Sequence, residues 1–188
     1  MCRSPVPPLL LLVLLLGLPA RGQAPTPELV LQNGHSLGIA AVAFSADGTL
    51  AATGSPDGTV RLWEVATGRV RLTLSAHGTG TNGAGVASLA LTPDGRLLVT
   101  GGWDARARVW SLATGEKVAE FESFSDYYPT LVAVSPDGRT LALGNGDKVS
   151  LVELSSGQAR WSANIEDVES VAWNPQGGVL AVGTSRGR

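Results

Sequence analysis

The sequence has 188 residues with 14 basic and 16 acidic side chains, a formal net charge of −2, and 44% hydrophobic residues. This mild acidity gives no reason to expect nucleic acid or an anionic membrane surface as a partner. Cys2 is the single cysteine, so no disulfide can form within the chain. No pattern of a long amphipathic helix is present, and the many Gly, Val, Leu and Thr residues indicate an ordered all-β chain.

Residues 1–22 are predicted to be a secretory signal peptide. Arg3 precedes the aliphatic run Leu9–Leu18, and Ala20-Arg21-Gly22 places small residues where a signal peptidase cleaves. The run is shorter than the roughly 20 residues that a membrane-spanning helix needs. We therefore expect a secreted or periplasmic protein with no membrane span after cleavage. A tether to the membrane by the uncleaved signal is the alternative.

After the signal, short apolar runs alternate with turns rich in Gly and Asp, which predicts a meander of short strands. Residues 23–34 are expected to form a leader with an outer strand at Glu28–Gln32. The expected strands of the first two units are Ile39–Ser45, Leu50–Gly54, Val60–Val65, Val70–Leu74, Val86–Leu91, Leu97–Thr100, Arg106–Trp110 and Lys117–Phe121. Those of the third and fourth units are Thr130–Val134, Thr140–Leu143, Val149–Leu154, Ala159–Ser162, Ser170–Trp173 and Val179–Gly183.

These strands belong to a repeat. The aspartates of two turns in each unit recur at intervals of 47 and 43 residues: Asp47, Asp94 and Asp137 in the first turn, and Asp57, Asp104 and Asp147 in the second. Four strands in a repeat of roughly 40–45 residues are typical of the blades of a β-propeller.

The repeats resemble the WD40 (β-transducin-like) family. Each well-formed unit has a histidine before its first strand, Thr–Gly late in its second strand, an aspartate in the next turn, and a tryptophan in its third strand. These residues are His35, Thr53, Asp57 and Trp63 in the first unit, and His77, Thr100, Asp104 and Trp110 in the second. The resemblance implies a WD40-like β-propeller in which the four side chains form a hydrogen-bonded structural tetrad.

The later units depart from this pattern. In the third unit Leu143 and Val152 stand where the hydroxyl and the indole are expected, although Asp147 remains, and in the fourth Val182 replaces the hydroxyl. We expect about three and a half four-stranded blades, with the first two the stiffer. The blades are expected at residues 35–75, 76–122 and 123–164, with a partial blade at 165–188.

Motifs that suggest catalysis have a structural explanation. Thr100, His77 and Asp104 are the residue types of a nucleophile, a base and an orienting acid, but the same set recurs in the first unit. Residues 183–187 match G-x-S-x-G, which requires a strand before it and a helix after it, whereas here it falls in a turn between strands. The two histidines belong to different units and the aspartates are turn residues. We therefore expect no catalytic residue, no metal and no cofactor.

Large aromatic residues remain as candidates for function. The resemblance places the second turn of each unit, and the loop that leads into each unit, on one rim of a propeller. Trp103 in such a turn, and Asp126, Tyr127 and Tyr128 in such a loop, are candidate partner-binding residues. The alternative is that these aromatic side chains pack against their own loop or cover a blade edge.

The expected function is a non-enzymatic, exported scaffold for protein–protein interaction, with unknown protein partners. One alternative is the sensor or accessory portion of a longer enzyme or signalling protein whose catalytic domain is absent here. Another is a fragment without a stable fold. Closed propellers have 4–8 blades, and open sheet edges favour aggregation. We therefore expect the missing blades to come from a longer chain, or else from assembly with another chain.

Overall fold

The computed structural model describes residues 34–78, 85–123 and 128–185. The predicted signal peptide, the predicted strand Glu28–Gln32, and the rim residues Asp126 and Tyr127 lie outside these ranges. The described residues form three four-stranded antiparallel sheets, which confirms the all-β prediction. No helix capable of crossing a membrane is found in this described part.

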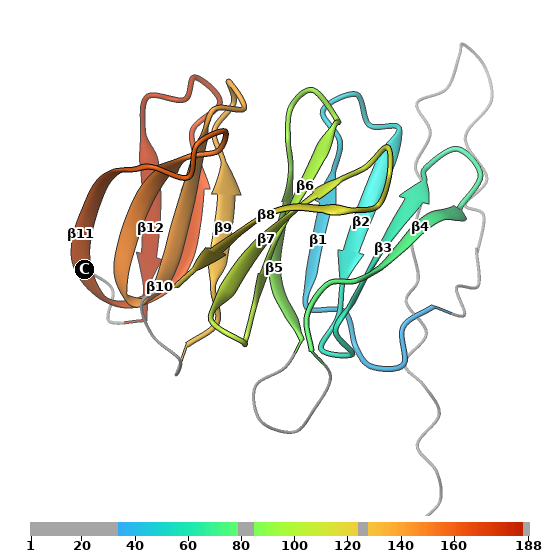
Figure 1. The fold of residues 1–188 in the computed structure, drawn as a ribbon, viewed down its shortest axis with the longest axis horizontal. Helices are drawn as coiled ribbons and strands as arrows, with labels where there is room; N and C mark the ends of the chain where they lie inside the picture. Colours follow the sequence, from blue (N-terminus) through green and yellow to red (C-terminus); the bar gives the residue numbers. More distant parts are fainter. Residues whose placement is uncertain (1–33, 79–84, 124–127, 186–188) are drawn as a thin grey trace, which may run out of the picture.

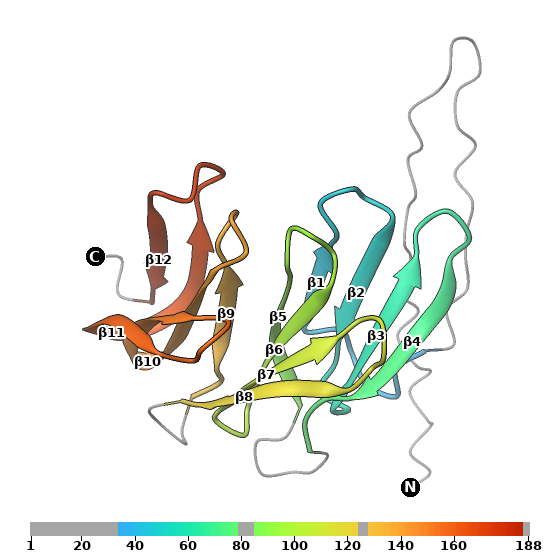
Figure 2. The same cartoon turned by 45° about the horizontal axis from the view of Figure 1, so that its top comes forward.

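Figures 1 and 2 show the three sheets side by side, with the second between the first and the third. The first sheet has the order β1-β2-β3-β4 and consists of β1 (Ala41–Phe44), β2 (Leu50–Gly54), β3 (Thr59–Glu64) and β4 (Arg69–Ser75). The second has the order β5-β6-β7-β8 and consists of β5 (Val86–Leu91), β6 (Leu97–Gly102), β7 (Arg106–Ser111) and β8 (Lys117–Glu122).

The third sheet has the order β12-β11-β10-β9 and consists of β9 (Leu131–Val134), β10 (Thr140–Glu153), β11 (Ala159–Trp173) and β12 (Leu180–Thr184). The predicted strands within β10 and within β11 are therefore joined into two long, curved strands (Figure 1). The strands expected in the fourth unit lie in this third sheet. Pairing of Gly146 with Val168 carries β11 past the bend of β10, where Gly146 adopts a φ of +48°.

The sheets stack through their innermost strands. Strand β1 packs on β5, β5 on β9, and β9 on β11. One buried apolar cluster fills the first junction and includes Leu62 and Leu98, and a second cluster fills the next junction and includes Val99 and Leu141. The C-terminal half of β11 thus takes the place of a fourth innermost strand, although it is hydrogen-bonded within the third sheet.

Glycine permits close approach at the junctions. A Cβ atom on Gly54, at the end of β2, would lie 2.5 Å from Cγ1 of Val86 at the start of β5. On Gly101 it would collide with the backbone carbonyl of Thr130. The glycine that follows Thr53 and Thr100 therefore sets the distance between neighbouring sheets.

The turn between the first two strands is built alike in each sheet. A hydroxyl donates to the aspartate two residues later: Ser45 Oγ to Asp47 Oδ1 at 2.6 Å, Thr92 Oγ1 to Asp94 Oδ1 at 2.6 Å, and Ser135 Oγ to Asp137 Oδ1 at 2.5 Å. The next residue is a glycine with a φ between +67° and +72°. The side chains that the turn requires are thus supplied locally, within six residues.

Candidate functional site

The tetrad of the first sheet joins four segments. Trp63 Nε1 on β3 donates to Thr53 Oγ1 on β2 at 2.9 Å, and the same hydroxyl lies 2.9 Å from His35 Nε2. On the other side of the ring, His35 Nδ1 lies 3.2 Å from Asp57 Oδ2, in the turn between β2 and β3. The chain before β1 is thereby tied to two strands and to their turn.

Donor chemistry gives this tetrad a direction. An indole N–H can only donate and an ionised carboxylate can only accept. Thr53 therefore accepts from Trp63 and donates to His35 Nε2, which leaves the proton of the ring on Nδ1, facing Asp57. Burial lowers the pKa of His35, although the nearby Asp57 opposes this effect, so the neutral ring that this arrangement requires is favoured.

Asp57 is the most heavily hydrogen-bonded side chain of the first tetrad. It accepts from the Ser36 N–H at 2.8 Å, the Thr59 N–H at 2.9 Å and the Thr59 hydroxyl at 2.7 Å. Burial raises the pKa of Asp57, but the Thr59 and Ser36 bonds and the nearby His35 lower it to about 2. The carboxylate is thus ionised over the whole neutral range and pins the turn between β2 and β3.

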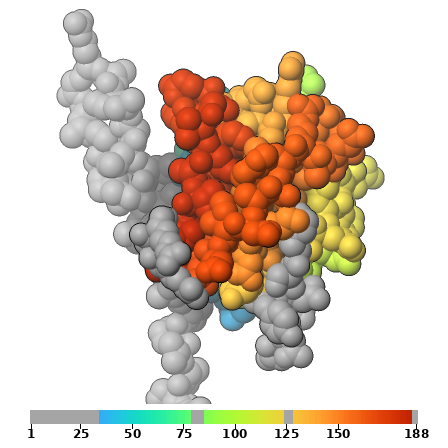
Figure 3. Space-filling model, turned by 90° about the vertical axis from the view of Figure 1, so that its left-hand side faces the viewer, coloured from blue at the N-terminus to red at the C-terminus, as the bar shows by residue number. Residues whose placement is uncertain are grey.

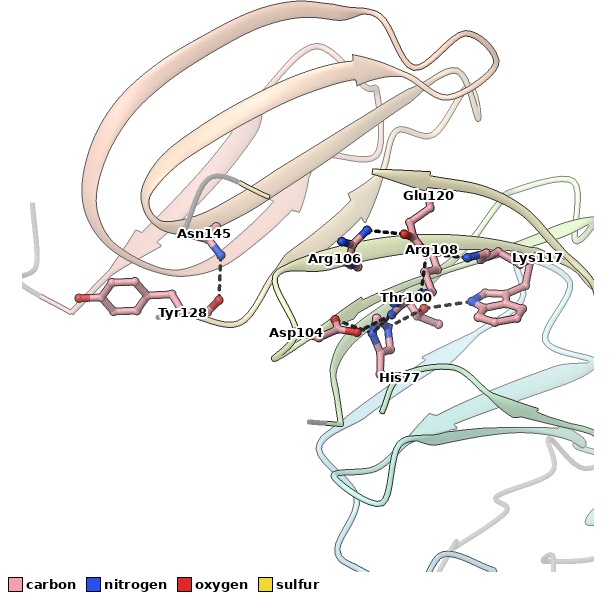
Figure 4. Close-up of polar contacts among 10 residues, drawn as sticks. His77, Thr100, Asp104, Arg106, Arg108, Lys117, Glu120, Tyr128 and Asn145 are labelled. Atoms are coloured by element: carbon pink, nitrogen blue, oxygen red, sulfur yellow. Dashed lines mark hydrogen bonds and ion pairs between the residues drawn. The ribbon is translucent and has the colours of Figure 1, made fainter. Parts of the chain in front are cut away.

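The second sheet repeats this geometry (Figure 4). Trp110 Nε1 donates to Thr100 Oγ1 at 3.1 Å, that hydroxyl lies 3.0 Å from His77 Nε2, and His77 Nδ1 lies 2.8 Å from Asp104 Oδ1. Arg108 adds a fifth member, because its Nη1 donates to Asp104 Oδ2 at 2.7 Å.

Asp104 is held ionised by its neighbours. Burial raises the pKa of Asp104, but hydrogen bonds from His77 and Arg108 outweigh it and lower the pKa to about 2. The two tetrads thus share a direction of hydrogen bonding and differ in what surrounds the carboxylate. Backbone and hydroxyl groups surround Asp57, whereas a guanidinium lies beside Asp104.

Arg108 extends the second tetrad to the outer strand of its sheet. Its Nε donates to Glu120 Oε2 at 2.9 Å, and Glu120 also accepts from Lys117 at 2.6 Å and from Arg106 at 2.5 Å (Figure 4). The Lys117 hydrogen bond is the main cause that lowers the pKa of Glu120 to about 2. Sequence analysis missed this cluster, which depends on the pairing of Arg108 with Glu120 across β7 and β8.

The third sheet has a different arrangement at the same place. Leu143 and Val152 are buried where the hydroxyl and the indole stand in the other sheets. The buried Asn145 donates from Nδ2 to the backbone carbonyl of Tyr128 at 2.8 Å (Figure 4). A side chain on Gly146 would collide with the Tyr128 ring, so this ring lies on the turn of its own sheet. Sequence analysis did not single out Asn145.

The tetrads lack the access that catalysis requires. The Thr100 side chain is fully buried, and its hydroxyl oxygen is engaged by both His77 and Trp110. A nucleophile must reach its substrate, and this oxygen has no exposed side. Among the described residues, no group of three or more His, Cys, Asp or Glu side chains is placed to hold a metal ion.

Trp103 and Tyr128 lie at the same edge of the molecule. Trp103, in the turn after β6, is 44% exposed, and Tyr128 is 40% exposed. The Thr130 N–H donates to the Gly102 carbonyl at 2.9 Å, which brings the segment that begins at Tyr128 alongside the turn that holds Trp103. Of the predicted rim residues, the structure therefore describes these two and brings their segments together.

Comparison with known proteins supports the repeat assignment. The family model described as "WD domain, G-beta repeat" matches residues 26–64 and 68–111, and these ranges contain both tetrads. A segment of 36 residues is 58% identical to Protein Mut11 of Chlamydomonas reinhardtii. That segment is 19% of this chain and spans about a tenth (10%) of the relative.

Proposed function

We propose that this chain, whose repeats are those of the WD40 family, is a non-enzymatic scaffold that binds a protein partner at the edge formed by Trp103 and Tyr128. WD40 repeats generally serve in protein interaction, and the hydroxyl and carboxylate groups of both tetrads are occupied by structural hydrogen bonds. The exposed Trp103 beside a pinned turn is the observation that carries the proposal.

The turn prepares Trp103 for binding. The next residue, Asp104, is bonded to both His77 and Arg108, and the Trp103 N–H donates to the Gly85 carbonyl at 3.1 Å. A rigid backbone presents the indole without an ordering cost at the moment of association. Tryptophan and tyrosine are enriched among residues that dominate binding energy, because they combine a large apolar area with a polar tip.

Tyr128 adds a second anchor on the neighbouring sheet. Its ring lies on Gly146 and its backbone carbonyl accepts from Asn145, so the residue is held from two sides. A partner that contacts both aromatic rings therefore bridges the second and third sheets.

The test is capture of partners by the purified chain and by the double variant Trp103→Ala, Tyr128→Ala. We expect the double variant to lose at least about ten-fold in affinity, since a binding anchor contributes on the order of 2 kcal/mol. The matched control is Trp161→Ala, because Trp161 is 49% exposed but lies on β11, away from this edge. Unchanged capture by a correctly folded double variant would refute the binding edge.

We also propose that the scaffold is exported, on the basis of Arg3 and the aliphatic run Leu9–Leu18. The protein expressed in its own cell type should be found outside the cytoplasm with Gln23 as its first residue. N-terminal sequencing checks this, and recovery of an intact N-terminus from the cytoplasm contradicts it.

A further inference from the structure

The two outer sheets of the stack each carry an exposed face. On β1, Val42 and Phe44 are 55% and 56% exposed, and we call this pair the start face. At the other end of the stack, Ala181 and Gly183 on β12 pair with Ala172 and Ser170 on β11. We call these four residues the end face, and Figure 3 looks onto this end of the molecule.

The start face has buried counterparts inside the chain. Val42 pairs with Thr53, Leu89 pairs with Thr100, and Val132 pairs with Leu143, so Val42, Leu89 and Val132 hold the same position in successive sheets. Leu89 and Val132 are only 8% and 5% exposed, because each packs on the preceding sheet, at Gly54 and Gly101 respectively. Val42 is the one member of this set that has no preceding sheet among the described residues.

The end face has buried counterparts as well. Ala52, Val99 and Ala142 precede the junction glycine by two residues, as Ala181 precedes Gly183, and all three are fully buried. Gly54, Gly101 and Gly144 each contact the strand that follows, whereas a side chain on Gly183 would meet only Ser170 of its own sheet. Ala181 is exposed. Nothing in the described residues packs on this glycine in the way that β5 packs on Gly54.

We propose that the end face of one copy of this chain receives the start face of a second copy, as a further junction of the kind that already joins the sheets. Within one copy the two faces lie at opposite ends of the stack and cannot meet (Figure 1). The contact continues an interface that the chain already makes, with Val42 in the place of Leu89 and Gly183 in the place of Gly54. It is head-to-tail, so each added copy leaves one further face of each kind unless a ring closes.

The first measurement is the mass of the purified chain by light scattering or sedimentation over a range of concentrations. We expect association into dimers or higher multiples of the chain mass. A monomer at every concentration up to the solubility limit would overturn the proposal. In that outcome the start face is either free or covered by the chain's own N-terminal residues.

Variants then test the two faces separately. Val42→Glu and Ala181→Glu each place a charge in the proposed junction, and each should weaken association at least about ten-fold, because a buried unpaired charge is costly. Val118→Glu is the control, since Val118 is 56% exposed but lies on the outer strand β8 of the middle sheet. Circular dichroism establishes that all three variants keep the fold.

Mixing decides the direction of the contact. The Val42→Glu copy keeps an intact end face and the Ala181→Glu copy keeps an intact start face, so a mixture of the two should form a complex that neither forms alone. If Ala181→Glu associates like the unmodified chain while Val42→Glu is monomeric, the copies pair start face to start face and the head-to-tail proposal is wrong. It is equally wrong if the mixture stays monomeric.

Discussion

The first two sheets and the third hold the same backbone position by different means. In the former, a chain of hydrogen bonds runs from an indole through a hydroxyl and an imidazole to a carboxylate. In the latter, Leu143 and Val152 fill the place of the hydroxyl and the indole, and the Asn145 amide ties the turn to the segment before β9. Apolar packing can therefore replace the tetrad without loss of the sheet.

The difference lies in what each arrangement demands. A buried hydrogen-bonded network requires all of its members at once, since the loss of one leaves the others unpaired. Apolar packing requires only volume and shape, which neighbouring side chains can adjust. We therefore expect the tetrad sheets to respond more sharply to substitution, and the four predictions below test this, from the largest expected effect to the smallest.

Gly101→Ala should be the most damaging change. Its methyl group would meet the backbone carbonyl of Thr130, which cannot move without shifting β9, and we expect a loss of about 3 kcal/mol or more. Gly144→Ala in the third sheet faces the ends of two side chains, Val171 Cγ1 at 3.0 Å and Val168 Cγ1 at 3.2 Å. It should cost about 1 kcal/mol. Urea unfolding measures both, and equal losses would contradict the difference.

Thr100→Val should follow. It removes the hydroxyl that accepts from Trp110 and donates to His77, and leaves two buried polar groups unpaired, at a cost of about 2–4 kcal/mol. Leu143→Val is the matched change in the third sheet and removes a single methylene, which costs about 1 kcal/mol. If the two variants unfold at the same urea concentration, the tetrad is no more demanding than apolar packing.

Acid should act on the tetrad sheets through their carboxylates. Asp57 has a pKa of about 2 in the fold against 3.8 ordinarily, so its stabilising contribution is complete above pH 3.8 and is lost as the pH falls through 2. Asp57→Asn should cost about 1–2 kcal/mol at neutral pH and flatten the acid limb of the stability profile. Asp147→Asn, at the exposed equivalent position in the third sheet, should leave that limb unchanged. A profile altered equally by both would refute this assignment.

Glu120→Gln should have the smallest effect. Glu120 joins Lys117 and the two arginines of β7, but Lys117 and Arg106 are 45% and 38% exposed in their side chains. Exposed ion pairs contribute about 0–1 kcal/mol and are screened by salt. Thermal melts at low and high ionic strength should therefore converge for the variant and the unmodified chain. A loss above about 2 kcal/mol would indicate that the cluster supports the second tetrad through Arg108.

The strands of the first two sheets follow from local patterns. Runs such as Leu50–Gly54 coincide with observed strands, because each is bounded by a turn whose Asp and Gly residues are adjacent in sequence. The tetrad residues could likewise be chosen by their fixed spacing within a repeat. Their function as a set, and the role of Trp103 and Tyr128 in binding, stay predictions.

The rest depends on long-range pairing. The union of two predicted strands in β11 requires Val168 to pair with Gly146, a contact across 22 residues that no local pattern encodes. The Arg108–Glu120 ion pair depends on a register that shifts by one residue between Val109 and Trp110. A side chain such as Asn145, which bonds to a backbone carbonyl, leaves no partner of a particular residue type to find in the sequence.

The hydroxyl–aspartate turn that opens each sheet has a consequence for how the chain folds. Because Ser45 and Asp47, like Thr92 and Asp94 or Ser135 and Asp137, are two residues apart, each hairpin can close before any distant contact exists. Hairpins form in roughly 1–10 microseconds, far faster than distant strands meet. Repeat chains can begin folding in any unit, so three equivalent starting points are available, and the junction glycines are called upon only when neighbouring hairpins dock.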